Sequence, residues 1–402
     1  MSRAASTWPR CLLNCAAKTT KDKRRRVVFL TGTRADFGKL KPLMRLVEDH
    51  DDLDCHVFVT GMHTLRIYGE TWQEVRNCGF KNFHVMHNQY VGEPMESILA
   101  NTVQGLARYV AEVQPELLVV HGDRVEALAG ALVGTLAHVK VAHIEGGERS
   151  GTVDETIRHA VSKLSHLHFV ANEDAARRVR QLGEVPEHIF VIGSPDIDVM
   201  HSPDLPSLES VRERYEIHYP EYGILLFHPV TTELRDIGEY TQALVNAVIA
   251  SEKPFVAIYP NNDAGTEFIL SAYRRLESCA NVRVFPSIRF ESFLTLLKNA
   301  SLMIGNSSAG VREAPIYGVP AVDIGTRQNE RYDGPGVTHV GYGEQEILAA
   351  IQQQFGARTA GIDSRFGHGD SAAKFLQVLS ENDIFSVPQQ KLFQDLKFGE
   401  PN

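Results

Sequence analysis

The sequence predicts an α/β protein built from two doubly wound parallel sheets. Short β-branched and apolar segments alternate with segments of helical periodicity along most of the chain, which is typical of parallel sheets covered by helices on both faces. A stretch rich in Pro and Ser at 201–210 interrupts this alternation, which then starts again. The chain has 402 residues, more than one hydrophobic core usually holds, so we expect two domains.

The first domain is expected at 26–200. Its helix at 37–50 has Leu40, Leu43, Leu46 and Val47 on one face, and a long amphipathic helix ends before Pro115. A nearly all-apolar helix follows at 124–138. The strands are expected at 27–30, 54–61, 116–123, 139–147, 166–172 and 188–195, and a loop followed by a helix at 65–80.

The second domain is expected at 201–370, and a helical tail at 371–402. Strands are expected at 222–230, 254–259, 280–288, 301–305 and 319–325, and helices at 291–300 and after Ser308. Ligands of doubly wound folds bind at the carboxyl ends of the strands, so two such domains predict a ligand site in the cleft between them.

Composition excludes several classes of protein. Hydrophobic residues make up 43% and charged residues 23%, as in ordinary globular proteins, and no apolar run approaches the ~20 residues that span a bilayer. A net charge of −9 argues against a nucleic-acid partner. The five cysteines are scattered without a CxxC pair, which favours the cytoplasm and argues against a disulfide framework or zinc site.

The first 25 residues are basic and contain no acid before Asp22. We interpret them as a disordered extension or as the product of an early start codon. A weak resemblance to a transit peptide is the alternative.

Two carboxylates, Asp123 and Glu145, each follow an apolar strand and are separated by one strand–helix–strand unit. A right-handed crossover makes these strands parallel, so both carboxylates should lie at the same edge of the sheet, beside His121 and His143. Close carboxylates push their pKa values apart, which suits one acid and one base. The alternative is that each caps the helix or loop that follows.

A third acid, Asp154, is expected in the first turn of a helix that begins near Val153. Thr152 and Glu155 have the spacing of a capping box at this terminus. Asp154 is therefore either an ordinary N-terminal helix acid or a member of the same acidic group.

The second domain has features of an anion site. Ser307 and Ser308 lie where a strand leads into a helix, and free N–H groups at such a terminus bind phosphate. Glu313 follows within reach of ribose hydroxyls. Arg34, in a strand–turn–helix of the first domain, could clamp phosphate, and His228 and Arg327 each follow a strand of the second domain. We find no metal-binding motif.

Several motifs together resemble the hydrolysing UDP-N-acetylglucosamine 2-epimerases. They appear in that family's order from about Arg26 to beyond Gln328: TGTRADFGKLKPL, HGDR, HIEGGE, HPVTTE, YPNNDAGTE and GNSSAGVREAPIYGVP. The chain is similar to the bacterial enzymes of sialic acid precursor synthesis and to the epimerase half of the animal bifunctional epimerase/kinase.

The resemblance implies two Rossmann-like domains in the GT-B arrangement, with a C-terminal helix packed back on the first domain. It implies conversion of UDP-N-acetylglucosamine and water to N-acetylmannosamine and UDP, by anti elimination to 2-acetamidoglucal and syn addition of water. It implies no cofactor or metal, no nucleic-acid or membrane partner, and a homodimer or homotetramer. The implied catalytic residues are Asp123, Glu145, Asp154 and His228. The implied nucleotide contacts are Arg34, Arg124, His228, Asn261, Ser307, Ser308, Glu313 and Arg327.

The chain departs from the family at two places. Gly38 replaces a small polar residue, so any side-chain contact there is lost. The segment VFPSIRF lacks the Lys-His pair of a basic loop that contacts a CMP-sialic acid inhibitor in the animal enzyme, so we do not expect that feedback inhibition.

Three other functions are compatible with parts of the sequence. The same reaction on UDP-N,N'-diacetylbacillosamine ranks second, because the AGVREAP run looks more like the N-acetylglucosamine enzymes. A GT-B glycosyltransferase would need an acceptor groove, for which we see no signal. A nucleotide-sugar sensor would be expected to lack some of the acids, and all three are present.

Overall fold

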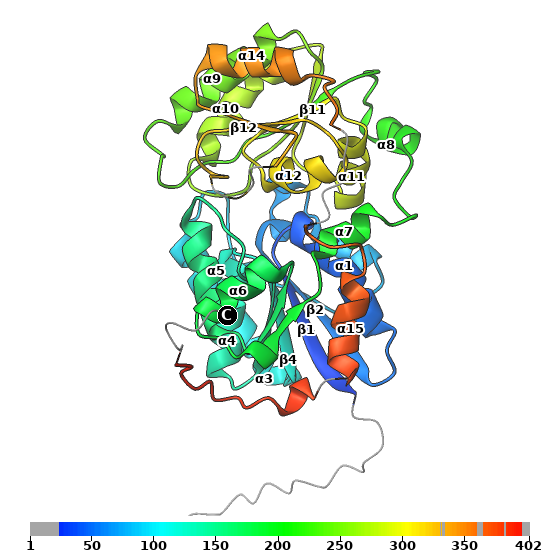
Figure 1. The fold of residues 1–402 in the computed structure, drawn as a ribbon, viewed down its shortest axis with the longest axis vertical. Coiled ribbons are helices and arrows are strands. Elements are labelled where there is room, and N and C mark those ends of the chain that lie inside the picture. Colours follow the sequence, from blue (N-terminus) through cyan, green and yellow to red (C-terminus); the bar gives the residue numbers. More distant parts are fainter. Residues whose placement is uncertain (1–23, 330, 332–333, 360–364, 382, 396–402) are drawn as a thin grey trace, which may run out of the picture.

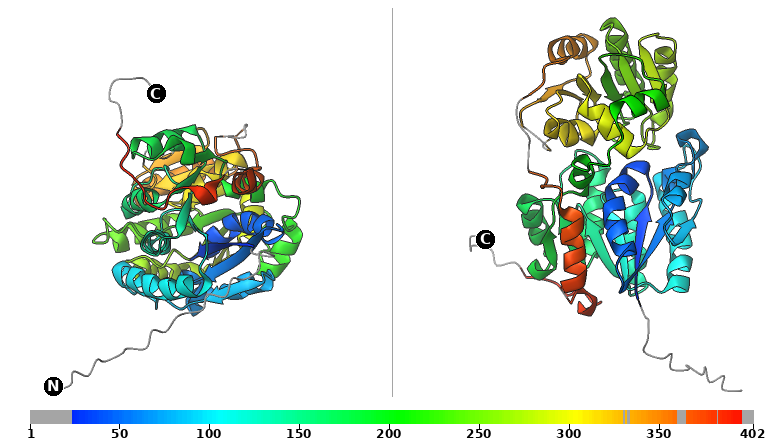
Figure 2. Two further views of the ribbon diagram at one scale, coloured as in Figure 1. Left: turned by 90° about the horizontal axis from the view of Figure 1, so that it is seen from below. Right: turned by 90° about the vertical axis from the view of Figure 1, so that its right-hand side faces the viewer.

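The protein folds into two lobes, each a parallel sheet with helices on both faces (Figures 1 and 2). The structure is a computed structural model that describes residues 24–329, 331, 334–359, 365–381 and 383–395. Most of the expected N-terminal extension therefore lies outside the described residues, as does the end of the tail. The prediction of two doubly wound parallel sheets is confirmed.

The N-terminal lobe contains a seven-stranded sheet in the order β3-β2-β1-β4-β5-β6-β7, and every pairing is parallel. The strand order changes direction between β1 and β4, which opens a crevice at their carboxyl ends. The strands are β1 Arg25–Thr31, β2 Leu53–Val59, β3 Asn82–Val85, β4 Leu117–His121, β5 Lys140–Ile144, β6 Leu167–Val170 and β7 Ile189–Val191. The helices are α1 Arg34–Glu48, α2 Trp72–Asn77, α3 Met95–Val113, α4 Val125–Leu136, α5 Val153–Leu164, α6 Glu173–Gln181 and α7 Pro195–Met200.

Successive residues of β1 point to opposite faces of this sheet and enter different cores. Val27 and Phe29 pack with the residues of α1, whereas Val28 and Leu30 pack with those of α3 and α4. All four side chains are nearly inaccessible to solvent. A strand that is buried on both faces must be apolar throughout, which explains the continuous VVFL run.

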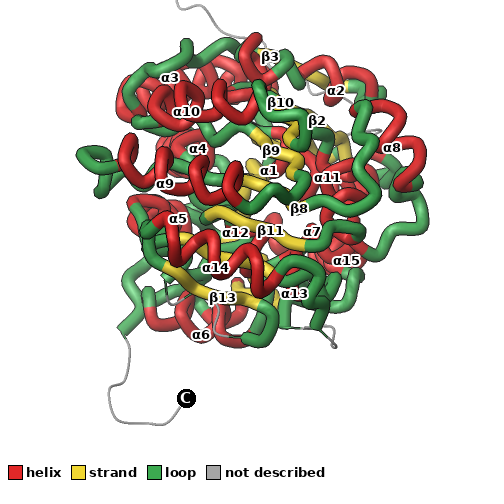
Figure 3. Tube along the Cα trace, turned by 90° about the horizontal axis from the view of Figure 1, so that it is seen from above, coloured by secondary structure: helices red, strands yellow, loops and turns green. Residues whose placement is uncertain are grey.

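The C-terminal lobe repeats this arrangement with six strands in the order β10-β9-β8-β11-β12-β13. Helices α9, α10 and α14 cover the face away from the N-terminal lobe, and α11 and α12 lie on the side facing it (Figures 1 and 3). The strands are β8 Gly223–Leu226, β9 Phe255–Ile258, β10 Val282–Phe285, β11 Leu302–Gly305, β12 Ala321–Ile324 and β13 Val337–Val340. The helices are α8 Leu208–Tyr215, α9 Ile237–Ala250, α10 Thr266–Glu277, α11 Phe290–Lys298, α12 Ser308–Val311, α13 Glu313–Ile316 and α14 Glu344–Gln354.

The last helix, α15 Ser371–Glu381, returns to the N-terminal lobe and lies beside α1 (Figure 1). Phe375 is fully buried there, with its ring centroid 6.2 Å from that of Phe29 and 4.8 Å from that of Phe169. The chain thus crosses between the lobes twice, which ties them together at one side of the cleft. Among the described helices, none is long and apolar enough to cross a bilayer.

Candidate active site

A cavity of about 270 Å³ lies between the lobes, at the carboxyl ends of both sheets. All eleven residues singled out in the sequence line it. The N-terminal lobe contributes Arg34, Asp123, Arg124, Glu145 and Asp154, and the C-terminal lobe contributes His228, Asn261, Ser307, Ser308, Glu313 and Arg327. Both sheets end at this cleft, so the loops after β1, β4 and β5 face those after β8, β9 and β11.

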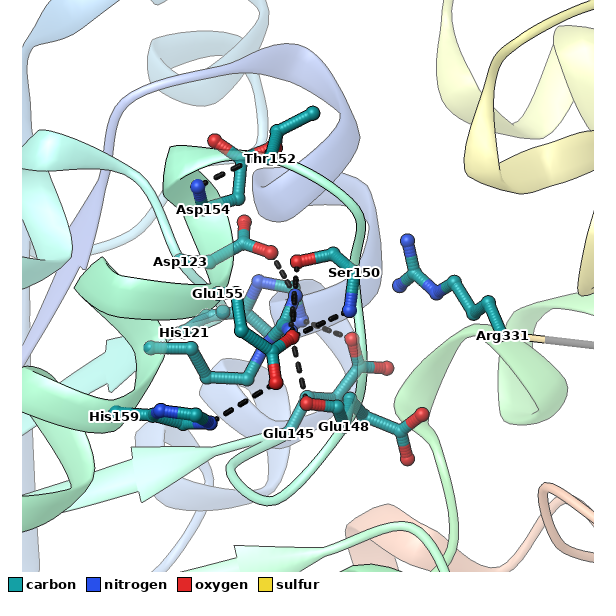
Figure 4. Close-up of polar contacts among 12 residues, drawn as sticks. His121, Asp123, Glu145, Glu148, Ser150, Thr152, Asp154, Glu155, His159 and Arg331 are labelled. Atoms are coloured by element: carbon teal, nitrogen blue, oxygen red, sulfur yellow. Dashed lines mark hydrogen bonds and ion pairs between the residues drawn. The ribbon is translucent and has the colours of Figure 1, made fainter. Parts of the chain in front are cut away.

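Asp123 is held by an arginine from α5. Arg158, whose side chain is 2% exposed, donates Nη2 to Oδ2 of Asp123 and Nη1 to the carbonyl oxygen of Glu148 over 3.0 Å. Figure 4 shows Asp123 and Asp154 close to each other in this part of the site. Burial alone would raise the pKa of Asp123, but Arg158, Arg331 and Arg327 outweigh it and lower that pKa. Asp123 is therefore ionised at neutral pH.

Asp154 has the opposite tendency. Burial and the charge of Asp123 raise the pKa of Asp154, although Arg327 opposes them from the other lobe, with Nη2 3.3 Å from Oδ2. Helix α5 begins at Val153, as predicted, and Oγ1 of Thr152 accepts the N–H of Asp154. The other half of the expected capping box differs, because Glu155 accepts the N–H of Ser150 rather than that of Thr152.

Glu145 follows β5 with a left-handed backbone, φ = 63°, which is uncommon for a non-glycine residue. Its N–H donates to the carbonyl oxygen of Phe169 over 2.9 Å, which fixes the turn. The carboxylate accepts two hydrogen bonds from Arg312 and lies 3.3 Å from Nε2 of His121. His143 is fully buried away from the cavity, between Ser162 and the carbonyl oxygen of Gly122, so its role is structural.

Three charged residues that sequence analysis missed surround Glu145. Nζ of Lys39 lies 3.2 Å from Asp196 and 3.5 Å from Glu313, and Arg312 lies 3.6 Å from Asp196. Asp196 is fully buried at the first turn of α7. Lys39 lies in the motif TGTRADFGKLKPL, Arg312 lies in GNSSAGVREAPIYGVP, and Asp196 follows a predicted strand. No local sequence pattern around these residues predicts which side chain each one contacts.

His228 is rigidly placed between two strand ends of the C-terminal lobe. Its backbone exchanges two hydrogen bonds with the side chain of Asn306, over 2.7 and 2.8 Å. Nδ1 of the ring accepts the backbone N–H of Asn261 over 3.0 Å. Burial and the nearby Arg327 and Arg124 keep the pKa of His228 well below its usual value. The ring is therefore neutral and carries its proton on Nε2.

The helix expected after Ser308 forms, but it is broken into two short helices, α12 and α13. Ser307 caps α12 through the N–H of Ala309, but α12 has only four residues and ends before Arg312. Pro315 explains the break, because it has no N–H to donate to the carbonyl of Val311 and its ring would clash there. The break turns Arg312 toward the N-terminal lobe, while Ser307 and Ser308 still face the cavity.

Arg34 and Arg124, the two arginines of the N-terminal lobe that were expected to contact the nucleotide, both make ion pairs. Arg34 donates to Glu74 over 2.5 Å and to Ser287 of the other lobe over 2.6 Å. Arg124 reaches Asp263 of the other lobe, with Nη2 3.4 Å from Oδ1. Among the described residues, no group of His, Cys, Asp and Glu could hold a metal ion.

The chain is similar to known proteins over most of its length. The family profile described as UDP-N-acetylglucosamine 2-epimerase matches residues 45–380. The UDP-N-acetylglucosamine 2-epimerase of Neisseria meningitidis serogroup B is 49% identical over 375 residues, which cover 92% of this chain and 99% of that protein. The chain belongs to the UDP-N-acetylglucosamine 2-epimerase family. A UDP-N,N'-diacetylbacillosamine 2-epimerase (hydrolyzing) of Legionella pneumophila is 31% identical, over 90% of this chain and 97% of that protein.

Solved structures of UDP-N-acetylglucosamine 2-epimerases share the fold of this family member. One from Neisseria meningitidis, bound to UDP-GlcNAc, has a TM-score of 0.74 at 21% identity and covers 89% of this chain and 100% of that one. One from Methanocaldococcus jannaschii, in complex with UDP-GlcNAc and UDP, has a TM-score of 0.74 at 22% identity with the same coverage. The fold is therefore the GT-B-like two-domain fold of these epimerases.

Proposed function

We propose that this epimerase is of the hydrolysing type and converts UDP-N-acetylglucosamine and water to N-acetylmannosamine and UDP. In this reaction UDP leaves C1 while a proton is lost from C2, which gives 2-acetamidoglucal. Water then adds across the double bond with inversion at C2. The product would supply sialic acid synthesis.

The observation that carries this proposal is a pair of acids in one cavity whose pKa values are shifted in opposite directions. Inversion at C2 requires a base on one face of the sugar and a proton donor on the other, because one group cannot reach both faces. Asp123 is ionised and suits the base, whereas the raised pKa of Asp154 suits the proton donor. Glu145 is ionised and lies in the same cavity, so it suits the role of accepting a proton from the water that adds at C1.

The hydrogen-bond donors at the cleft, one of them a cation, suit the departing diphosphate. Negative charge develops on the phosphate as the C1–O bond breaks, and fixed donors stabilise it without rearrangement. Nε2–H of His228, Arg327 and the N–H groups beside Ser307 and Ser308 line the same cavity from the C-terminal lobe. Glu313 is assigned to the ribose hydroxyls, and Arg34, Arg124 and Asn261 to the nucleotide.

The test is incubation with UDP-N-acetylglucosamine in deuterated water. We expect free UDP, free N-acetylmannosamine and one deuterium at C2. Intact nucleotide sugar equilibrated at C2 would contradict the hydrolysing type. The matched experiment uses UDP-N,N'-diacetylbacillosamine, the substrate class named for the Legionella relative. Turnover of that sugar alone would replace the substrate proposed here, although the 49% identity to the Neisseria protein favours N-acetylglucosamine.

A further inference from the structure

Arg312 joins the two lobes at the carboxylate of Glu145. It belongs to the C-terminal lobe, between α12 and α13, and Glu145 belongs to the N-terminal lobe, after β5. Nη1 lies 3.2 Å from Oε2 and Nη2 lies 2.8 Å from Oε1, so the pair is bidentate. The side chains are only 2% and 7% exposed, respectively.

The guanidinium is itself held from three sides. Nη2 donates to Oγ of Ser194 over 2.5 Å and lies 3.6 Å from Oδ2 of Asp196. The ring of Phe366 packs against its flat face, with the guanidinium carbon 4.7 Å from the ring centroid. Ser194 also donates to Oε1 of Glu145, so both ends of the ion pair share one hydroxyl. Because the planar guanidinium is fixed in this way, it determines the plane of the Glu145 carboxylate that it binds.

We propose that Arg312 is a positioning residue that fixes the orientation of the Glu145 carboxylate when the two lobes are closed on each other. The inference rests on the proposed function, in which Glu145 acts on the sugar. In the sequence Arg312 lies between Ser308, which is proposed to contact phosphate, and Glu313, which is proposed to contact the ribose. The segment that would bind the nucleotide therefore also orients Glu145. Binding of the nucleotide is thereby linked to the orientation of the Glu145 carboxylate.

The charges around Glu145 show what removal of Arg312 would do. Burial would raise the pKa of Glu145, but Arg312, then Lys39 and His121, outweigh it and hold that pKa well below its usual value. Without Arg312, burial opposes only the weaker contacts, with Nζ of Lys39 4.0 Å away. The carboxyl group would then protonate at a higher pH. The titratable groups that face Glu145 are Lys39, His121, Asp196, Arg312 and Glu313.

The experiment compares Arg312→Ala and Arg312→Lys with Lys41→Ala. Lys41 also bridges the lobes, 2.5 Å from Glu291, but it is absent from the cavity lining and is therefore a matched control. For Arg312→Ala we expect kcat to fall about 100-fold, by analogy with loss of one fixed catalytic donor, while KM and the Kd for UDP change less than about threefold. The acid limb of the kcat profile should move to higher pH.

Rescue separates positioning from stability. Guanidinium ion, at concentrations that leave the wild type folded, should restore part of the activity of Arg312→Ala but none to Glu145→Gln. Arg312→Lys should retain the position of the acid limb better than Arg312→Ala, because it keeps the charge. An unshifted pH profile without rescue would overturn the proposal. Loss of UDP binding at unchanged kcat would also overturn it, because Arg312 would then be a phosphate anchor.

A second readout does not depend on turnover. The carboxyl ¹³C resonance of Glu145, identified by its absence in Glu145→Gln, can be titrated in the UDP complex of the wild type and of Arg312→Ala. A higher pKa in the variant supports the positioning role, and an unchanged pKa refutes it. If the wild type does not hydrolyse UDP-N-acetylglucosamine, the proposed function fails, and this titration still decides the inference.

Discussion

The backbone N–H of Asn261 donates to Nδ1 of His228 over 3.0 Å, so the neutral ring presents Nε2–H to the cleft. His228 is therefore a hydrogen-bond donor at neutral pH and not a base. We expect ¹⁵N NMR of the histidine rings to show the Nε2–H tautomer for His228 and no titration of that ring between pH 5.5 and pH 8, because burial and two arginines lower its pKa.

The same contact predicts different effects of two substitutions at His228. Gln places an amide N–H close to the position of Nε2, whereas Asn is too short to do so. We expect His228→Asn to lower kcat by about 10²–10³, as for loss of an oxyanion donor, and His228→Gln to lower it less. Steady-state kinetics of UDP release measures both. Equal loss in the two variants would refute a donor role.

The opposite pKa shifts of Asp123 and Asp154, with the roles proposed from them, predict at which step of the reaction each variant is blocked. Asp123→Asn removes the base, so UDP release should fall by about 10²–10⁴ and no glycal should form. Asp154→Asn removes the proton donor of the second step, so UDP should be released while 2-acetamidoglucal accumulates. Product analysis by mass spectrometry separates these outcomes, and UDP binding by calorimetry controls for folding. Accumulation of the glycal in Asp123→Asn instead would exchange the two roles.

The pH profile of the wild type follows from the same pair. The pKa of Asp123 is lowered, so this proposed base stays ionised to a lower pH than a free aspartate does. The pKa of Asp154 is raised, so this proposed acid keeps its proton to a higher pH than a free aspartate does. We expect kcat to decline on the alkaline side as Asp154 loses its proton. Arg327 lowers the pKa of Asp154, so Arg327→Gln should move this alkaline limb to higher pH.

Gly38 makes the contact between the lobes intolerant of a side chain. A Cβ atom there would lie 2.5 Å from Cβ, Cγ and Cδ1 of Phe290 in α11. We expect Gly38→Ser to lower the free energy of unfolding by about 1–3 kcal/mol through overpacking, and to raise KM. Urea unfolding measures the change. Adding Phe290→Ala should recover part of the loss, and Gly238→Ser is a matched control because its nearest atom would lie 3.7 Å away.

Glu184 anchors the C-terminal segment to the N-terminal lobe. Its side chain is 2% exposed and lies 3.1 Å from His168, 2.9 Å from Lys163 and in an ion pair with Lys391. Burial opposes these contacts, which nevertheless lower the pKa of Glu184 to about 2. The stabilisation is fully present above the ordinary pKa of glutamate and is lost as the pH falls below that pKa toward about 2.

We therefore expect Glu184→Gln to cost about 2 kcal/mol of unfolding free energy at pH 7 and less than half of that at pH 3. Denaturant unfolding at the two pH values checks this, with the exposed Glu221→Gln as the control. An equal cost at both pH values would show that the carboxylate charge does not matter.

The sequence by itself determined the fold class and the position of most of the site. Apolar strands alternating with helices require parallel sheets, and a right-handed crossover brings the ends of β4 and β5 to one edge, so Asp123 and Glu145 could be placed together. The same reasoning put Ser307, Ser308 and His228 at strand ends that face the cleft. These inferences succeed because backbone handedness and the burial of apolar faces act locally.

Only the tertiary structure decided which charged and polar side chains contact each other. Arg312 and Glu145 are 167 positions apart, and Arg34 and Ser287 are 253 apart, so no local pattern links them. The opposite pKa shifts of Asp123 and Asp154 likewise arise from burial and from the charges of residues in other segments. The pKa of a carboxyl group depends on desolvation and on charges within a few ångströms, and those distances exist only after the two lobes have folded and come together.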